Sequence, residues 1–331
     1  MTKMSSTIYW CDDCNVPIFE NICPSCGNKG RYVATDMRPV FPEENVLISL
    51  ILGDDPQKYQ ESSVWFGSGM YIIDGKKVRL SITKLNSLPL DKIHKLKENR
   101  NIKKYQKYLI EGVHLVEEAL KSELVEEIIV SENFTNSKVF DNFYGEVTIV
   151  SENVFKSLTD TVTTQGVIAV CKIKNKQLDI SKYSRVLIID QVQDPGNLGT
   201  IIRTADAFSF DCIILGKGTT SIYGQKVIRS MQGSNFHIDC FDNIDILDVI
   251  PKMEDFDLYA TSLKGDRYLE QIDSVGEKVA VIFGNEGSGV SEEILDKVNN
   301  LLKINMTGQA ESLNVAVAAG IVMHYIATKC E

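Results

Sequence analysis

Three polar loops, each directly after a short apolar run, place the strongest constraint on how this chain folds. The first two runs, residues 186–189 and 279–283, are unbroken stretches of mostly β-branched and other apolar residues. Such runs are typical of strands that are buried on both faces of a parallel sheet. The polar loops begin near residues 190, 284 and 305. Because open α/β sheets bind ligands at the carboxyl ends of their parallel strands, the loops predict one shared site.

Five polar side chains in and after these loops are candidates for chemistry: Asn197, Arg203, Glu286, Ser312 and Asn314. Ser312 and Asn314 are also good N-cap residues for the alanine-rich helix that follows them. Glu286 suits a helix N-terminus, where the helix dipole favours a carboxylate. For these three residues a purely structural role stays open. An arginine within an otherwise apolar helix is costly unless it is paired, which favours a site role for Arg203.

The length and composition indicate a protein with ample core and local basic charge. Its 331 residues are 44% hydrophobic, which suits two domains and a small addition. The net charge of −10 argues against a surface that binds nucleic acid throughout. Basic residues nevertheless dominate residues 92–107, where Glu98 is the only acid. This run is either a solvated basic surface or a local phosphate-binding patch.

Neither a signal peptide nor a membrane span is predicted. The polar residues 1–9 carry no apolar signal core, and no apolar run approaches the length that crosses a bilayer. We therefore expect a cytoplasmic protein without a membrane partner.

Residues 8–37 are predicted to form a separate zinc ribbon. The two C-x-x-C pairs Cys11/Cys14 and Cys23/Cys26 supply four thiolates, which complete a tetrahedral zinc site. No coordination position is left open, so we expect a structural Zn²⁺. The ribbon is too short for a core of its own, so the metal would provide most of its folding energy.

The rest of the chain divides into three further segments. Residues 38–89 are predicted to be an accessory β-rich segment, with a hairpin at 71–80 that turns at Asp74-Gly75. Residues 90–175 alternate strand and helix patterns, as a small α/β domain does. Residues 183–331 contain the three polar loops and form the last domain.

From about residue 90 onward the chain resembles the SpoU (TrmH-type) RNA ribose 2′-O-methyltransferases of the SPOUT class. The resemblance is carried by residues 194–197 with Arg203, by residues 284–289, and by residues 304–306 with 312–315. Two further motifs, at residues 108–112 and 165–167, are similar to the RNA substrate-binding domain of that family. The resemblance implies an α/β fold: a parallel-sheet methyltransferase domain with a trefoil knot, preceded by a small α/β RNA-binding domain.

The resemblance also implies ligands and partners. Family members bind S-adenosylmethionine in the knot, as homodimers whose site is completed across the interface. Four residues match cofactor-contacting positions: Gly284, Ile304, Met306 and Leu313. Asn305 departs from the family pattern, in which proline commonly precedes the methionine, and Ala316 stands where serine is common.

The expected activity is S-adenosylmethionine-dependent 2′-O-methylation of structured RNA, with ribosomal RNA favoured over transfer RNA. A transfer-RNA ribose methyltransferase and a non-catalytic RNA- or ribosome-binding factor that keeps the fold remain the alternatives. In the family Arg203 matches the proposed catalytic residue. A guanidinium stays charged at neutral pH, so we expect it to stabilise the developing alkoxide or to bind a phosphate. Glu286 is expected to pair with Arg203, Asn197 to orient Arg203 or the ribose, and Ser312 and Asn314 to bind the nucleotide.

Overall fold

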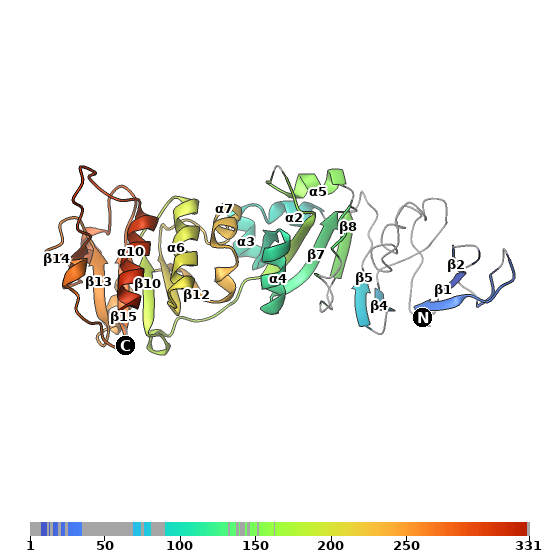
Figure 1. The fold of residues 1–331 in the computed structure, drawn as a ribbon, viewed down its shortest axis with the longest axis horizontal. Helices are drawn as coiled ribbons and strands as arrows, with labels where there is room; N and C mark the ends of the chain where they lie inside the picture. Colours follow the sequence, from blue (N-terminus) through green and yellow to red (C-terminus); the bar gives the residue numbers. More distant parts are fainter. Residues whose placement is uncertain are drawn as a thin grey trace. The chain divides into compact units, whose positions relative to one another are not determined.

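The computed structural model describes residues 8–11, 13, 16–18, 21–23, 26–34, 69–73, 76–80, 90–131, 133–136, 139, 143, 146–150, 152–161 and 163–329. The chain divides into two compact units, residues 1–173 and 174–331, each of which is described by itself (Figure 1).

The second unit is built on a parallel sheet. Its strands are β10 (Arg185–Ile189), β11 (Cys212–Gly216), β12 (Asp239–Ile244), β13 (Asp257–Thr261), β14 (Arg267–Tyr268), β15 (Val279–Phe283) and β16 (Asn300–Lys303). Its α-helices are α6 (Pro195–Ala207), α7 (Gln225–Met231), α8 (Ile246–Val249), α9 (Glu292–Leu295) and α10 (Val315–Ala327).

The seven strands lie in the order β12-β11-β10-β15-β13-β16-β14, and every neighbouring pair is parallel. The two predicted apolar runs are the adjacent strands β10 and β15, in a register that places Ile189 opposite Phe283. All side chains of residues 186–189 and 279–282 have 0% exposure, as strands covered on both faces require. The predicted parallel α/β fold of this unit is confirmed.

Local sequence signals set the ends of the two longest helices. Asp194 accepts a hydrogen bond of 2.9 Å from the Asn197 N–H group and so caps α6, with Pro195 as the first helical residue. Asn314 caps α10 in the same way. Gly199 lets α6 approach α7, because a Cβ atom there would lie 2.4 Å from Ser230 Cβ and 2.7 Å from the Val227 carbonyl oxygen. Helix α6, which carries Asn197 and Arg203, and helix α10, which Asn314 caps, thus have fixed starting points.

In the first unit, one mixed sheet joins segments that the sequence analysis separated. Its strands are β4 (Gly69–Ile73), β5 (Lys76–Leu80), β6 (Lys107–Glu111), β7 (Val125–Ser131), β8 (Glu146–Val150) and β9 (Val167–Lys172), and its helices are α2 (Leu90–Lys95), α3 (Asn99–Tyr105), α4 (Val113–Lys121) and α5 (Glu152–Leu158). The order is β4-β5-β8-β7-β9-β6.

The predicted hairpin is the antiparallel pair β4–β5, in which Ile73 lies opposite Lys76. The turn residues Asp74 and Gly75 lie outside the described residues. Strand β5 then pairs in parallel with β8, Leu80 opposite Val147. The sheet therefore contains strands from both sides of residue 90, where the sequence pattern suggested a boundary between an accessory segment and an α/β domain. The two segments are joined by backbone hydrogen bonds, and a sequence pattern does not show which backbones pair.

The N-terminal residues form a small sheet of their own, in the order β2 (Val16–Ile18), β1 (Ile8–Cys11), β3 (Arg31–Ala34). Cys11 is the last residue of β1, and Cys14 lies outside the described residues. Cys23 is 1% exposed and begins a tight turn, in which its carbonyl oxygen accepts a hydrogen bond of 2.8 Å from the Gly27 N–H group. Within the described residues no three metal-binding side chains come together. Because Cys14 lies outside the described residues, the zinc site stays a prediction.

Among the helices that the structure describes, none is both long enough and apolar enough to cross a bilayer.

Candidate functional site

The loops after β10 and β15 are joined at the carboxyl edge of the parallel sheet. The Asp190 N–H group donates to the Phe283 carbonyl oxygen at 2.8 Å, and the Asp190 carboxylate accepts a hydrogen bond of 2.8 Å from the Ser291 N–H group. Gln191 adopts a left-handed backbone conformation with φ of 58°, and its carbonyl oxygen accepts a hydrogen bond of 2.9 Å from the Asn285 side chain. A non-glycine residue is rarely held in this conformation unless its surroundings fix it, and such residues cluster at functional sites.

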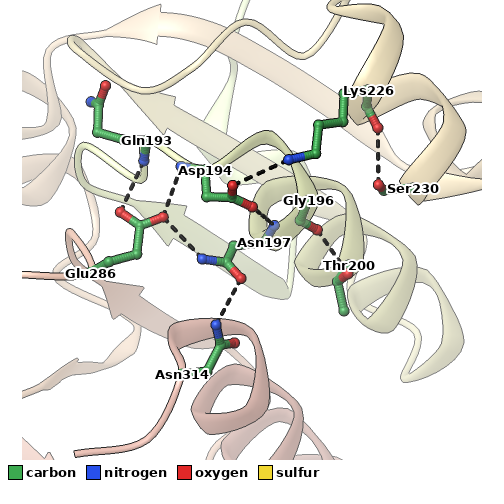
Figure 2. A network of polar contacts seen from close by, with 9 residues as sticks. All are labelled: Gln193, Asp194, Gly196, Asn197, Thr200, Lys226, Ser230, Glu286 and Asn314. Atoms are coloured by element: carbon green, nitrogen blue, oxygen red, sulfur yellow. Dashed lines mark hydrogen bonds and ion pairs between the residues drawn. The ribbon is translucent and has the colours of Figure 1, made fainter.

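Glu286 holds the first loop in place. Its carboxylate accepts hydrogen bonds from the N–H groups of Gln193 at 3.1 Å and Asp194 at 2.9 Å, and from the Asn197 side-chain amide at 3.1 Å (Figure 2). Partial burial raises the pKa of Glu286, but these three hydrogen bonds outweigh it, and the pKa lies below the ordinary glutamate value. Glu286 is therefore a fixed anion and a poor general base.

Asn197 connects Glu286 to the third loop through a hydrogen bond with Asn314. Its side-chain oxygen accepts a hydrogen bond of 2.9 Å from Asn314 Nδ2 (Figure 2). The Asn314 side-chain oxygen in turn accepts hydrogen bonds from the N–H groups of Ala316 at 2.9 Å and Val317 at 3.3 Å. A carboxylate only accepts hydrogen bonds, so Glu286 sets the orientation of the Asn197 amide. The helix N–H groups set that of Asn314 in the same way. The chain Glu286–Asn197–Asn314 thus has a single consistent pattern of donors and acceptors.

Arg203 does not join this chain. It lies on α6 with an exposed side chain, and within the described residues it has neither a hydrogen bond nor an ion pair. The expectation that Glu286 pairs with Arg203 is wrong here, because backbone N–H groups and Asn197 occupy the carboxylate. The Arg203 guanidinium is solvated and therefore carries no burial cost that a partner would have to offset. Arg203 remains a cation held on a rigid helix and available to a ligand.

A cavity of about 330 Å³ opens beside the polar chain. The four predicted cofactor residues Gly284, Ile304, Met306 and Leu313 all line it, together with Glu286 and Ser312. Asn197, Arg203 and Asn314 do not line it. The structure therefore places the predicted set in two groups, one in the cavity wall and one on and between α6 and α10.

Residues 261–264, at the end of β13 and in the loop after it, form a further wall of this cavity that was not predicted from the sequence. Leu263 lies there with 67% exposure, next to Lys264. The available signal was a short apolar stretch, Leu258–Ala260, followed by Thr261 and Ser262, which repeats the pattern of strand and polar loop in a weaker form. Strand β13 pairs directly with β15, which brings this loop to the same edge of the sheet.

A second, shallower hollow lies between α6 and α10. Its lining consists of Asn197, Thr200, Asn314, Ala316, Val317, Gly320, Ile321 and His324. The apolar residues Val317 and Ile321 are 52% and 39% exposed. An apolar helix face that adjoins site residues is an unusual surface to leave to solvent.

The fold and the site define a class: α/β proteins with a ligand cavity at the carboxyl edge of a parallel sheet, closed by a C-terminal helix. The description "SpoU rRNA Methylase family" matches residues 184–324, and "MRM3-like substrate binding domain" matches residues 90–169. The chain belongs to the SpoU rRNA methylase family. The segment resemblance noted from the sequence is thereby confirmed.

Individual relatives agree. The chain is 41% identical over 241 residues to the 23S rRNA (guanosine(2553)-2′-O)-methyltransferase RlmP of Bacillus subtilis, an alignment that covers 71% of this chain and 93% of the relative. It is similar to the AdoMet-bound rRNA methyltransferase from Sinorhizobium meliloti, with a TM-score of 0.67, 27% identity, and coverage of 75% and 97% of the two chains. An RNA 2′-O ribose methyltransferase structure matches with a TM-score of 0.64 and 26% identity over 75% and 98%.

Proposed function

We propose that this protein transfers a methyl group from S-adenosylmethionine to a ribose 2′-oxygen in ribosomal RNA, in the cytoplasm. The observation that carries the proposal is the convergence of Gly284, Ile304, Met306 and Leu313 on one cavity beside the Glu286–Asn197–Asn314 chain. The similarity to a 23S rRNA 2′-O-methyltransferase supports ribosomal RNA as the substrate class.

The cavity fits a cofactor of this size. Its volume of about 330 Å³ lies within the range of small-molecule pockets, and its wall combines apolar side chains with polar loop segments. When bound, S-adenosylmethionine would supply an activated methyl group, so no metal is needed for the transfer. The protein's task is to orient the acceptor oxygen, which contributes on the order of 7–11 kcal/mol in favourable cases.

The polar side chains divide this task. Glu286 and Asn314 act on Asn197 and the loop around it, and thereby fix the start of α6. Arg203, on the same helix, supplies a permanent positive charge that stabilises developing negative charge on the 2′-oxygen or binds the adjacent phosphate. Ser312 lies in the cavity wall, and its hydroxyl would bind the nucleotide.

Two further structural features are proposed, a homodimer and a knot. The active form is a homodimer that buries the hollow between α6 and α10, which would explain why Arg203 lies outside the cavity of its own chain. The second is a trefoil knot formed by the C-terminal segment. The support comes from the path of this segment. It leaves β16, runs along the cavity wall and ends as α10, which packs against α6. Helix α6 follows β10, and β15 and β13 lie between β10 and β16 in the sheet.

The N-terminal ribbon is proposed to hold a structural Zn²⁺ through Cys11, Cys14, Cys23 and Cys26. The support is the turn that begins at buried Cys23, with Gly27 in a left-handed conformation at φ of 76°. Elemental analysis of the purified protein tests the metal, and the Cys11→Ser variant should release it.

The activity is tested by incubation of the protein with methyl-labelled cofactor and with ribosomal or transfer RNA from cells that lack the protein. We expect label in the 23S ribosomal RNA, and we expect the RNA backbone to resist alkaline cleavage at the one methylated ribose. Cofactor binding without transfer to any RNA would instead establish a non-catalytic RNA-binding factor, and label in transfer RNA alone would establish the transfer-RNA alternative.

A further inference from the structure

We propose that the last turn of α3 is an RNA contact surface, in which Lys103 and Lys104 bind phosphates and Tyr105 stacks on an unpaired base. These three residues are named the α3 surface below. The inference rests on the proposed function for the identity of the partner, and it adds where the first unit holds that RNA.

The structure sorts the basic run of residues 92–107 into two kinds of side chain. Lys97 has a structural role within the unit. Its ammonium group donates hydrogen bonds to the carbonyl oxygens of Ser157 and Thr159, at 3.2 Å each, and to the Asp160 carboxylate at 2.9 Å. Lys107 is also neutralised, through an ion pair with Glu126.

Arg100 pairs with Glu98 at 2.6 Å, which uses the only acid of the run. The exposed ammonium groups of Lys103 and Lys104 differ, because within the described residues neither has an ion pair or a hydrogen bond. Two adjacent positive charges without an acidic neighbour are available to an anion.

Tyr105 places an aromatic ring beside these charges. The residue is 38% exposed, and Lys104 Nζ lies 5.5 Å from the centre of its ring. The helix is anchored by Ile102, which is 2% exposed. The last turn of α3 therefore presents two charges and a ring on a backbone that is packed in place.

Helix stability alone explains part of this arrangement. Lysines in the last turn of a helix interact favourably with its dipole, so the sign of the charge at 103 and 104 would be expected on any such helix. The dipole gives no reason for an exposed aromatic residue to follow them. Exposed large apolar side chains are few in the described residues, and Tyr105 is one of them.

The chemistry of the surface matches single-stranded or looped RNA. Paired lysines bind successive phosphates, and aromatic side chains beside them stack on unstacked bases. The chain as a whole carries a net charge of −10, so this local positive surface is an exception that a polyanionic partner would exploit. An acidic protein segment would satisfy the lysines but would not need the ring.

The test measures binding of the full-length protein to a 23S ribosomal RNA transcript over a series of salt concentrations. The plot of log K against log salt has a negative slope, and each phosphate contact contributes about 0.7 to 0.9 to its magnitude. Lys103→Ala with Lys104→Ala should therefore reduce the magnitude of the slope by about 1.5. Tyr105→Ala should weaken binding about tenfold with little change in slope, and Tyr105→Leu should not restore it, because stacking needs an aromatic face.

The matched control is Lys121→Ala with Lys156→Ala, which removes two charges from exposed lysines of the same unit, on α4 and α5. An equal change of slope in this control, or none in the α3 variant, overturns the inference. Unchanged RNA affinity in Tyr105→Ala, with lost affinity in the lysine variant, overturns base stacking and favours a general polyanion surface. Lys103→Arg with Lys104→Arg keeps the charge and should bind as the unchanged protein does, which shows that binding depends on the charge at these two positions.

Cofactor binding and methyl transfer are measured in parallel. If the unchanged protein methylates ribosomal RNA while the α3 variants bind and react normally, only this inference fails. If the unchanged protein transfers no methyl group to any RNA, the proposed function fails as well.

Discussion

Asn314 Nδ2 donates a hydrogen bond of 2.9 Å to Asn197 Oδ1 across 117 positions of the chain. The same Asn314 side chain caps α10 through its oxygen, while Asn197 lies in the first turn of α6. One amide pair therefore fixes the starts of both helices relative to each other. Helix capping and site assembly, which the sequence presents as alternatives, are performed by one side chain, the cap by its oxygen and the contact with Asn197 by its nitrogen.

Asn314→Asp separates these two roles. Aspartate caps a helix as well as asparagine does, but it cannot donate to Asn197. We expect Asn314→Asp to slow methyl transfer while thermal stability stays close to that of the unchanged protein. Asn314→Ala should lose both, with about 0.5–2 kcal/mol of stability removed with the cap. Equal transfer rates in the Asp variant and the unchanged protein would contradict the role of the amide pair.

Glu286 gives the protein a measurable pH dependence. Its folded-state pKa is lowered, chiefly by hydrogen bonds that outweigh partial burial, so its contribution to stability is present above the unfolded-state value of about 4.3. That contribution is lost as the pH falls through the lower folded-state pKa. Denaturant unfolding of Glu286→Gln should show lower stability than the unchanged protein at pH 6–8, and the gap should narrow below about pH 4.

Glu293→Gln, an exposed residue of α9, is the control for loss of one negative charge in the same unit. A gap for Glu286→Gln that is the same at pH 3 and at pH 7 would show that the carboxylate's charge does not stabilise the loop.

Arg203→Ala should lower the single-turnover rate of methyl transfer by about 10²- to 10³-fold, as loss of one charge-stabilising group does. Cofactor affinity should stay within a few fold, because Arg203 does not line the cavity. Arg203→Lys keeps a point charge without the planar fork and should fall between the two. Parallel loss of cofactor binding and transfer would contradict the assigned role.

Two helix glycines should respond in opposite ways to alanine. At Gly199 a Cβ atom would lie 2.7 Å from the Val227 carbonyl oxygen, so α6 and α7 must separate and we expect a lower melting temperature. At Gly320 the nearest atom is Thr204 Cγ2 at 3.8 Å, and alanine should stabilise α10 by up to about 1 kcal/mol. Thermal unfolding followed by circular dichroism measures both, and a stable Gly199→Ala would show that the close helix approach is not required.

Ile321→Glu places a charge on the apolar face of α10 and tests the homodimer. We expect light scattering to report a monomer and methyl transfer to be lost, since the site would no longer be completed by a second chain. Leu247→Glu, at a residue with 37% exposure on α8, is the matched control and should stay dimeric. A dimeric Ile321→Glu protein would place the interface elsewhere.

The sequence predicted the parts of the site that depend on strand order and caps. Residues 186–189 and 279–283 are apolar enough to identify buried parallel strands, and the loops after them had to meet at one edge. The partners of individual side chains could not be predicted, because the Glu286 carboxylate binds backbone N–H groups, which every residue except proline possesses. The same limit applies to Lys97, because two of its three hydrogen-bond partners are backbone carbonyl oxygens.

The pairing of β5 with β8 has a practical consequence for shortened chains. A protein that starts at residue 90 would still contain both segments that match the family descriptions, residues 90–169 and 184–324. In such a protein the backbone N–H and C=O groups of Glu146 and Val147 on β8, which lie opposite Arg79 and Leu80, would have no neighbouring strand. An uncovered strand edge recruits other chains, so such a shortened protein should aggregate unless that edge is blocked by charge or proline.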